Sequence, residues 1–189
     1  MEGTVFAIVR HAEVDKKNPL GEAAPLTENG AEQAKEFARR CKKVGVDLAV
    51  LPTEDLPRFS QTAAEMEAVG IKVKRVDGIS FKNMKGKAPI REIAARYRSA
   101  GLDIMFKLSN DDTAPEKVVI IGSYPLIAGL RHDPATATDE ELEAKPDFCT
   151  GIIGVVARKH CRGCDEDGNE YYDCRAKLWI IETNFRPLD

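Results

Sequence analysis

An arginine and a histidine stand side by side near the start of the chain, where a run of apolar residues ends. Arg10 and His11 follow Val5 to Val9, a run typical of a buried strand. A neutral imidazole is a nucleophile, and a guanidinium is a planar, permanently charged fork that matches phosphate oxygens. At the end of a strand in an α/β sheet, where such proteins bind ligands, this pair indicates phosphoryl chemistry.

The elements that would position this pair alternate between short β-rich runs and helical periodicity, as βαβ units do. The pattern predicts strands over residues 4–10, 46–51, 71–76 and 117–122. Thr27 is expected to cap a helix that ends at Gly45 and buries one face, formed by Ala31, Ala34, Ala38, Cys41 and Val44. A second helix is expected to carry an apolar stripe from Phe59 to Val69, and Pro89 to open a third.

The remainder of the chain predicts two short helices and a pair of strands. One helix starts at Tyr124, and Thr138 with Glu141 forms a capping box for the other. Residues 151–158 and 176–182 are expected to form an antiparallel hairpin with a long polar turn. We therefore predict an α/β fold, a three-layer α/β/α sandwich with a mostly parallel doubly wound sheet and a C-terminal antiparallel hairpin.

Size and charge narrow the function classes. The 189 residues, 43% of them apolar, predict a single domain over residues 1–189. A net charge of -3 gives no field that would attract nucleic acid or an anionic membrane. With no apolar run long enough for a signal or a spanning helix, and with five cysteines, we expect a cytoplasmic protein with mostly free thiols.

Three ordered blocks of sequence resemble the histidine phosphatase superfamily, which includes cofactor-independent phosphoglycerate mutases and phosphohistidine phosphatases of the SixA type. They are Arg10-His11-Ala12-Glu13, Pro25-Leu26-Thr27-Glu28-Asn29-Gly30 followed by Glu32-Gln33-Ala34, and Leu56-Pro57-Arg58-Phe59-Ser60-Gln61-Thr62-Ala63. Thr138 to Leu142 and Thr150-Gly151-Ile152 are similar to segments of the mutase branch. The resemblance implies that His11 becomes phosphorylated, that Arg10 and Arg58 hold the phosphoryl oxygens, and that no metal or cofactor is required.

Two positions depart from this pattern. The family's fourth strand ends in a second histidine that donates to the phosphoryl oxygens, and Ser123 stands at the matching place. A serine before Tyr124-Pro125 is a good helix cap, so we favour capping over catalysis for Ser123, on the wall of the phosphate pocket. Asn83 lies in a segment that resembles the one carrying the family's proton-donating carboxylate, and an amide cannot protonate a leaving alkoxide. His132 and His160 are not expected to replace the missing histidine.

A cysteine-rich turn at about residues 159–175 is left unexplained by the resemblance. Cys161 and Cys164 have the spacing of a zinc knuckle, and Cys174 with His160 or Cys149 could complete four ligands. Because only one such pair exists, a disulfide and free thiols stay open as alternatives, and free thiols are favoured.

The sequence leaves two functions from different classes. The first is a metal-independent phosphatase that acts through a phosphohistidine at His11, with weak activity, on a small phosphorylated molecule or a phosphoprotein. The second is an inactive pseudophosphatase that binds phosphate or a phosphorylated partner without turnover. Losing an oxyanion-type donor typically costs about a hundredfold to a thousandfold in rate, so the pseudophosphatase stays an alternative.

Overall fold

The computed structural model describes residues 3–15, 17–18, 23–77, 79, 88–109, 115–157, 162–164, 170–172 and 177–185, with side chains up to Val156. The elements run in the order β1 (Gly3–Arg10), α1 (Glu28–Lys43), β2 (Leu48–Pro52), α2 (Pro57–Ala68), β3 (Lys72–Val76), α3 (Ile90–Ser109), β4 (Lys117–Gly122), α4 (Tyr124–Arg131), α5 (Asp139–Glu143), β5 (Gly151–Ala157), β6 (Arg162–Cys164), β7 (Glu170–Tyr172) and β8 (Lys177–Phe185).

The main sheet is mixed and has the strand order β3-β2-β4-β1-β5-β8. Strands β3, β2, β4 and β1 are parallel to one another, whereas β5 is antiparallel to both β1 and β8. The register pairs Arg10 with Gly122, so β1 and β4 end side by side. The residues that follow these two strands, His11 and Ser123, are thereby brought to the same edge of the sheet.

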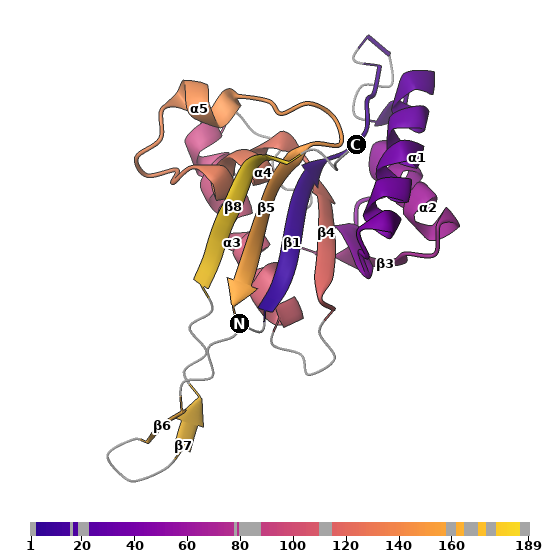
Figure 1. The fold of residues 1–189 in the computed structure, drawn as a ribbon. Helices are drawn as coiled ribbons and strands as arrows, with labels where there is room; N and C mark the ends of the chain where they lie inside the picture. Colours follow the sequence, from indigo (N-terminus) through magenta and orange to yellow (C-terminus); the bar gives the residue numbers. More distant parts are fainter. Residues whose placement is uncertain are drawn as a thin grey trace.

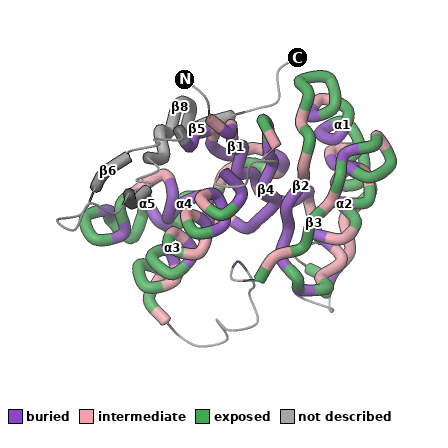
Figure 2. Tube along the Cα trace, turned by 90° about the horizontal axis from the view of Figure 1, so that it is seen from below, coloured by how far each residue is buried: buried purple, intermediate pink, exposed green. Residues whose placement is uncertain are grey.

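Helices cover both faces of the sheet, which confirms the three-layer α/β/α prediction (Figure 1). One core lies under α1 and α2 and includes Val9, Phe37 and Phe59. The other lies under α3 and α4 and includes Phe6, Tyr97 and Leu126. The central strands are buried along most of their length, whereas β3 at the edge is mostly exposed (Figure 2).

The two ends of α1 lie where the sequence predicts them. The Thr27 hydroxyl accepts a hydrogen bond from the Gly30 N–H at 2.9 Å, and Gly45 follows the helix in the left-handed region with φ 77°. The predicted apolar face was wrong at two positions, because Ala31 and Val44 are exposed. Phe37 is buried instead, since the helix is rotated so that residues 30, 34, 37, 38 and 41 face the sheet.

The chain after α4 also follows the predicted order. Thr138 and Glu141 form the capping box of α5, and β5 pairs with β8 as an antiparallel hairpin. Within the predicted turn of that hairpin, β6 and β7 form a separate two-stranded sheet. In the part of the chain that the structure describes, no helix is both long and apolar enough to span a bilayer.

Candidate active site

His11 lies at the carboxyl end of β1 and is buried, with 6% of its surface exposed. Its backbone N–H donates to the Gly122 carbonyl at 3.0 Å, which extends the β1–β4 pairing by one residue. The imidazole stands between two phenylalanine rings, edge-on to Phe59 with centroids 5.5 Å apart and tilted against Phe148 at 5.9 Å. These contacts hold the imidazole in one orientation.

The hydrogen bond of the His11 ring determines which nitrogen is available. Nδ1 lies 2.8 Å from the Ala12 carbonyl oxygen, which can only accept, so Nδ1 carries the proton of the neutral ring. Burial lowers the pKa of His11 to about 4; the Ala12 carbonyl opposes this shift, and the positive charges of Arg58 and Arg10 add to it. At neutral pH His11 therefore presents the unprotonated Nε2, the lone pair that a phosphoryl acceptor needs.

Arg10 is held beside His11 by the loop that precedes β5. Its Nη1 donates to the Pro146 carbonyl at 2.9 Å, and its guanidinium carbon lies 4.0 Å from the centre of the Phe148 ring. Burial lowers the pKa of Arg10, and the charge of Asp147 opposes that shift, so the guanidinium stays protonated at physiological pH. Phe148 therefore touches both members of the Arg10-His11 pair.

Arg58 reaches the same place from the first turn of α2. It is 8% exposed, and its guanidinium carbon lies 5.3 Å from the centre of the Phe59 ring, the ring that also contacts the His11 imidazole. Its charge is one of the causes that lower the pKa of His11. Thr62 connects the elements that carry them: its hydroxyl donates to the Arg58 carbonyl at 2.7 Å and accepts from the Ala12 N–H at 3.4 Å. Two guanidinium groups and one neutral imidazole thus converge, as an anion site for a phosphoryl group requires.

Ser123 lies beside His11, but the prediction that its hydroxyl caps α4 was wrong. The residue has the backbone of a helix N-cap without a side-chain capping bond. Pro125, at the second helical position, has no N–H to donate, and the N–H of Leu126 donates to the Ser123 carbonyl at 3.2 Å. The Ser123 hydroxyl is buried and has no hydrogen-bond partner among the described residues. A bound phosphoryl oxygen would supply that partner.

The loop after His11 is held in place by α1. The Glu13 N–H donates to Gln33 at 3.1 Å, and the Glu13 carboxylate accepts from Asn29 at 2.6 Å. A Cβ added to Gly30 would lie 2.1 Å from the Glu13 carbonyl oxygen, so only glycine allows α1 to approach this closely.

We expect Gly30→Ala to destabilise the protein by about 2 kcal/mol, because the added methyl group must push the Glu13 backbone away. The expected change in stability is opposite to the usual one, since alanine in a helix normally stabilises by about 1 kcal/mol relative to glycine. Urea unfolding measures the free energy of unfolding of Gly30→Ala. Ala31→Ser, at the exposed neighbouring position, is the control. A Gly30→Ala protein as stable as the wild type would contradict the close packing.

The structure places some predicted residues elsewhere and leaves others outside its described part. His132 caps the end of α4, as expected. Asn83 lies outside the described residues, as do the zinc candidates His160, Cys161 and Cys174, whereas Cys164 belongs to β6. Among the described residues no group of histidine, cysteine and acidic side chains is arranged to hold a metal ion. Cys149, the remaining zinc candidate, is a buried free thiol in the core beneath α1, together with Cys41.

Two residues that build the site were missed by sequence reasoning. Thr62 lies in the same sequence block as Arg58. The only feature of the sequence that indicates its role is a hydroxyl one helical turn after the arginine. Phe148 precedes the Thr150-Gly151-Ile152 block, but nothing local indicates that its ring lies against residues more than 130 positions earlier.

The low pKa of His11 predicts a specific loss of stability in acid. Between pH 6.5 and about 4 the unfolded chain binds a proton at His11 that the folded chain does not. The free energy of unfolding must therefore decrease as the pH falls through this window, by up to about 3 kcal/mol from His11. Urea unfolding at several pH values should show this component in the wild type and not in His11→Gln. A stability difference between the two proteins that does not vary with pH would contradict the assignment.

Comparisons with known proteins identify the family and the fold. The sequence model of the histidine phosphatase superfamily, branch 1, matches residues 6–114, which is more than half of the chain. No curated protein sequence gives a significant match.

Solved structures of the same fold include a mycobacterial glucosyl-3-phosphoglycerate phosphatase, 17% identical, with a TM-score of 0.61 and coverage of 97% of this chain and 99% of that one. A phosphoserine phosphatase from Entamoeba histolytica is 16% identical, with a TM-score of 0.56 and coverage of 97% and 98%. A phosphohistidine phosphatase of the SixA type from Agrobacterium tumefaciens, described as putative, is 17% identical, with a TM-score of 0.52 and coverage of 81% and 91%.

Proposed function

Because this chain belongs to the histidine phosphatase superfamily, we propose that it is a phosphatase that transfers a phosphoryl group first to His11 and then to water. The observation that carries this proposal is the state of His11, which is buried, neutral at pH 7 and directed by the Ala12 carbonyl so that Nε2 is the free nitrogen. The phosphatases among the structures with this fold support the same reaction class.

In the first step Nε2 of His11 attacks phosphorus in line with the leaving group. A P–N bond forms to His11 and the bond between phosphorus and the leaving group breaks, with the electron pair going to the leaving group. The Arg10 and Arg58 guanidinium groups bind the non-bridging oxygens, where charge develops in the transition state. In the second step water attacks phosphorus, the P–N bond breaks, and inorganic phosphate and neutral His11 are released.

Ser123 supplies a neutral donor where a cationic imidazole would give a stronger one. Its hydroxyl, which has no hydrogen-bond partner in the described part of the chain, would donate to a phosphoryl oxygen. Since a neutral hydrogen bond stabilises the developing charge less, we propose a weak activity. It should favour leaving groups that need little protonation, such as the imidazole of a phosphohistidine or an aryl alcohol. The substrate would then be a phosphoprotein or a small phosphorylated molecule.

The proposed reaction does not use a metal ion, because two guanidinium groups provide the positive charge that stabilises the phosphoryl oxygens. We therefore expect EDTA to leave the rate of p-nitrophenyl phosphate hydrolysis unchanged. A loss of activity with EDTA that added Mg²⁺ or Zn²⁺ restores would contradict this part of the proposal.

The alternative is a pseudophosphatase that binds phosphate without turnover. The observation that favours it is the buried Ser123, which follows β4 at the same edge of the sheet as His11 and offers only a neutral donor. A panel of aryl phosphates, phosphohistidine and alkyl phosphates, assayed with the wild type and with His11→Ala, separates the two. Phosphate release that requires His11 supports the enzyme. Equal background in both proteins, together with phosphate binding measured by calorimetry, supports the binding module.

A further inference from the structure

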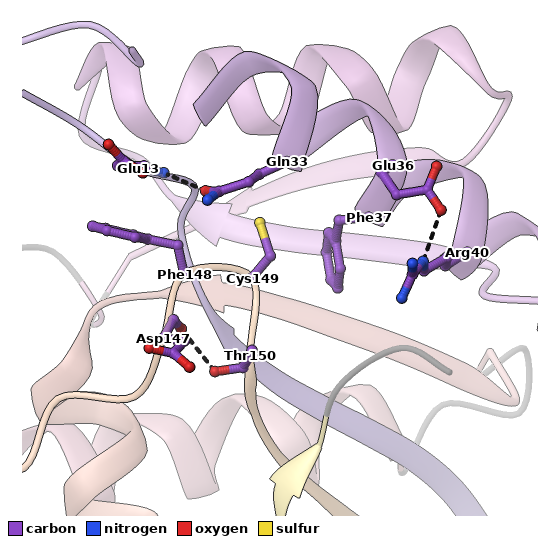
Figure 3. A pocket seen from close by; sticks show the side chains of 9 residues that line it. All are labelled: Glu13, Gln33, Glu36, Phe37, Arg40, Asp147, Phe148, Cys149 and Thr150. Atoms are coloured by element: carbon purple, nitrogen blue, oxygen red, sulfur yellow. Dashed lines mark hydrogen bonds and ion pairs between the residues drawn. The ribbon is translucent and has the colours of Figure 1, made fainter. Parts of the chain in front are cut away.

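Beside the phosphoryl site, the described part of the chain leaves a cavity of about 520 Å³, a size typical of small-molecule sites. One wall is α1, with Gln33, Glu36, Phe37 and Arg40, and the opposite wall is the loop before β5, with Asp147, Phe148, Cys149 and Thr150 (Figure 3). Glu13, two residues after His11, also lines the cavity and is hydrogen-bonded to Gln33 of α1.

Phe148 is the boundary between this cavity and the phosphoryl site. It lines the cavity, and its ring also contacts the Arg10 guanidinium at 4.0 Å and the His11 imidazole at 5.9 Å. On the other wall, Gln33 binds the backbone of Glu13, two residues after His11 (Figure 3). The cavity and the phosphoryl site therefore share Phe148 as a common wall.

The lining combines apolar surface with negative charge. Phe37 and Phe148 contribute the aromatic surface, and Glu13, Glu36 and Asp147 contribute three carboxylates against the single guanidinium of Arg40. That guanidinium is paired with Glu36, with its Nε 2.8 Å from the carboxylate oxygen. The nine lining residues thus carry a formal charge of -2. The charge of Asp147 also acts on Arg10, outside the lining, but a phosphoryl group bound to Arg10 would compensate that guanidinium. With the phosphoryl group in place, the carboxylates of the lining attract a cation and repel a second anionic group of a substrate.

We propose that this cavity is the leaving-group subsite of the phosphatase and that it selects phosphomonoesters whose leaving group has an apolar body with a positively charged amine. The inference rests on the proposed function, because the phosphoryl group must occupy the Arg10-His11 site. A leaving group with a carboxylate, as in a phosphorylated hydroxy acid, would place like charge against Glu13 and Asp147 and be disfavoured.

The Glu36–Arg40 pair allows a test with two variants that change the charge of the lining in opposite directions. Both residues line the cavity, and neither belongs to the phosphoryl site. Glu36→Gln makes the lining less negative, and Arg40→Gln makes it more negative. The Glu92–Arg96 pair has the same i,i+4 spacing on α3, on the other face of the sheet, so Glu92→Gln and Arg96→Gln are matched controls.

The substrates are 4-(aminomethyl)phenyl phosphate and 4-carboxyphenyl phosphate, and the measured quantity is the ratio of their kcat/KM values. Comparing this ratio between variants cancels the difference in leaving-group chemistry. We expect the wild type to prefer the amine. Glu36→Gln should lower the ratio about threefold and Arg40→Gln should raise it about threefold, the effect of a partly exposed charge pair. Both α3 variants should keep the wild-type ratio.

Cavity variants that change the ratio no more than the α3 controls, or that change it in the opposite direction, would overturn the subsite. If neither compound is hydrolysed above the His11→Ala background, the phosphatase proposal has failed. The cavity is then tested by the ratio of the dissociation constants of the two compounds, measured by calorimetry with the same variants. Equal dissociation constants for the two compounds, or no binding of either, would also overturn it.

Discussion

His11→Ala is expected to reduce kcat for p-nitrophenyl phosphate by about 10⁴-fold or more, because it removes the group that forms the covalent intermediate. No neighbouring side chain can replace Nε2: the guanidinium groups of Arg10 and Arg58 remain protonated, and a serine hydroxyl without a base is a poor nucleophile. The two guanidinium groups remain in the variant, so we expect its affinity for inorganic phosphate to change by no more than about tenfold.

The measurement combines the rate of nitrophenol release with calorimetric binding of phosphate. His11→Asn is a useful second variant, since its amide can still donate to the Ala12 carbonyl and fill part of the space between Phe59 and Phe148. His132→Ala, at the end of α4, is the control and should keep full activity. Activity in His11→Ala close to that of the wild type would exclude His11 as the nucleophile.

Arg58→Gln is expected to have the second largest effect, a loss of about a hundredfold to a thousandfold in kcat/KM. The substitution keeps a polar side chain in a nearly buried position and removes the charge that stabilises the phosphoryl oxygens. The same charge helps to lower the pKa of His11, so the pKa of His11 must rise in this variant. Burial, the larger cause, remains, and the pKa should stay below the ordinary value of 6.5.

Two measurements check the Arg58 prediction. Steady-state kinetics give the loss in kcat/KM, and NMR titration of the His11 ring protons gives its pKa. Arg75→Gln is the control, because Arg75 also contacts α2, through Ser60, but is exposed. Arg58 would be excluded from the site if its variant kept both the wild-type rate and the wild-type pKa of His11.

Features with a local cause could be predicted from the sequence. The apolar run that ends at Arg10 placed β1, and Thr27 and Gly45 placed the ends of α1, since capping and a left-handed residue depend on a few neighbours. The buried face of α1 was only partly predicted. Two stripes that differ by about one residue in position both fit the periodicity, and contact with the sheet favours the one that buries Phe37.

Features that depend on distant parts of the chain could not be predicted from residue patterns. Arg58 was placed with His11 only through a family resemblance, because the 46 residues between them carry no signal of contact. The contact of Phe148 with Arg10 depends on the path of the loop before β5. Among the described residues, the Ser123 hydroxyl has no partner because the first turn of α4 leaves it no backbone donor: Pro125 has no N–H, and the N–H of Leu126 donates to the Ser123 carbonyl.

The most direct test of the account is to look for phosphate on His11 itself. The protein is mixed with an excess of an aryl phosphate, quenched in alkali within milliseconds to seconds, and digested for mass spectrometry. We expect an acid-labile, alkali-stable phosphate on the peptide that contains His11 in the wild type, and none in His11→Ala. Hydrolysis of the aryl phosphate without phosphate on that peptide, or with phosphate on another residue, would contradict the account.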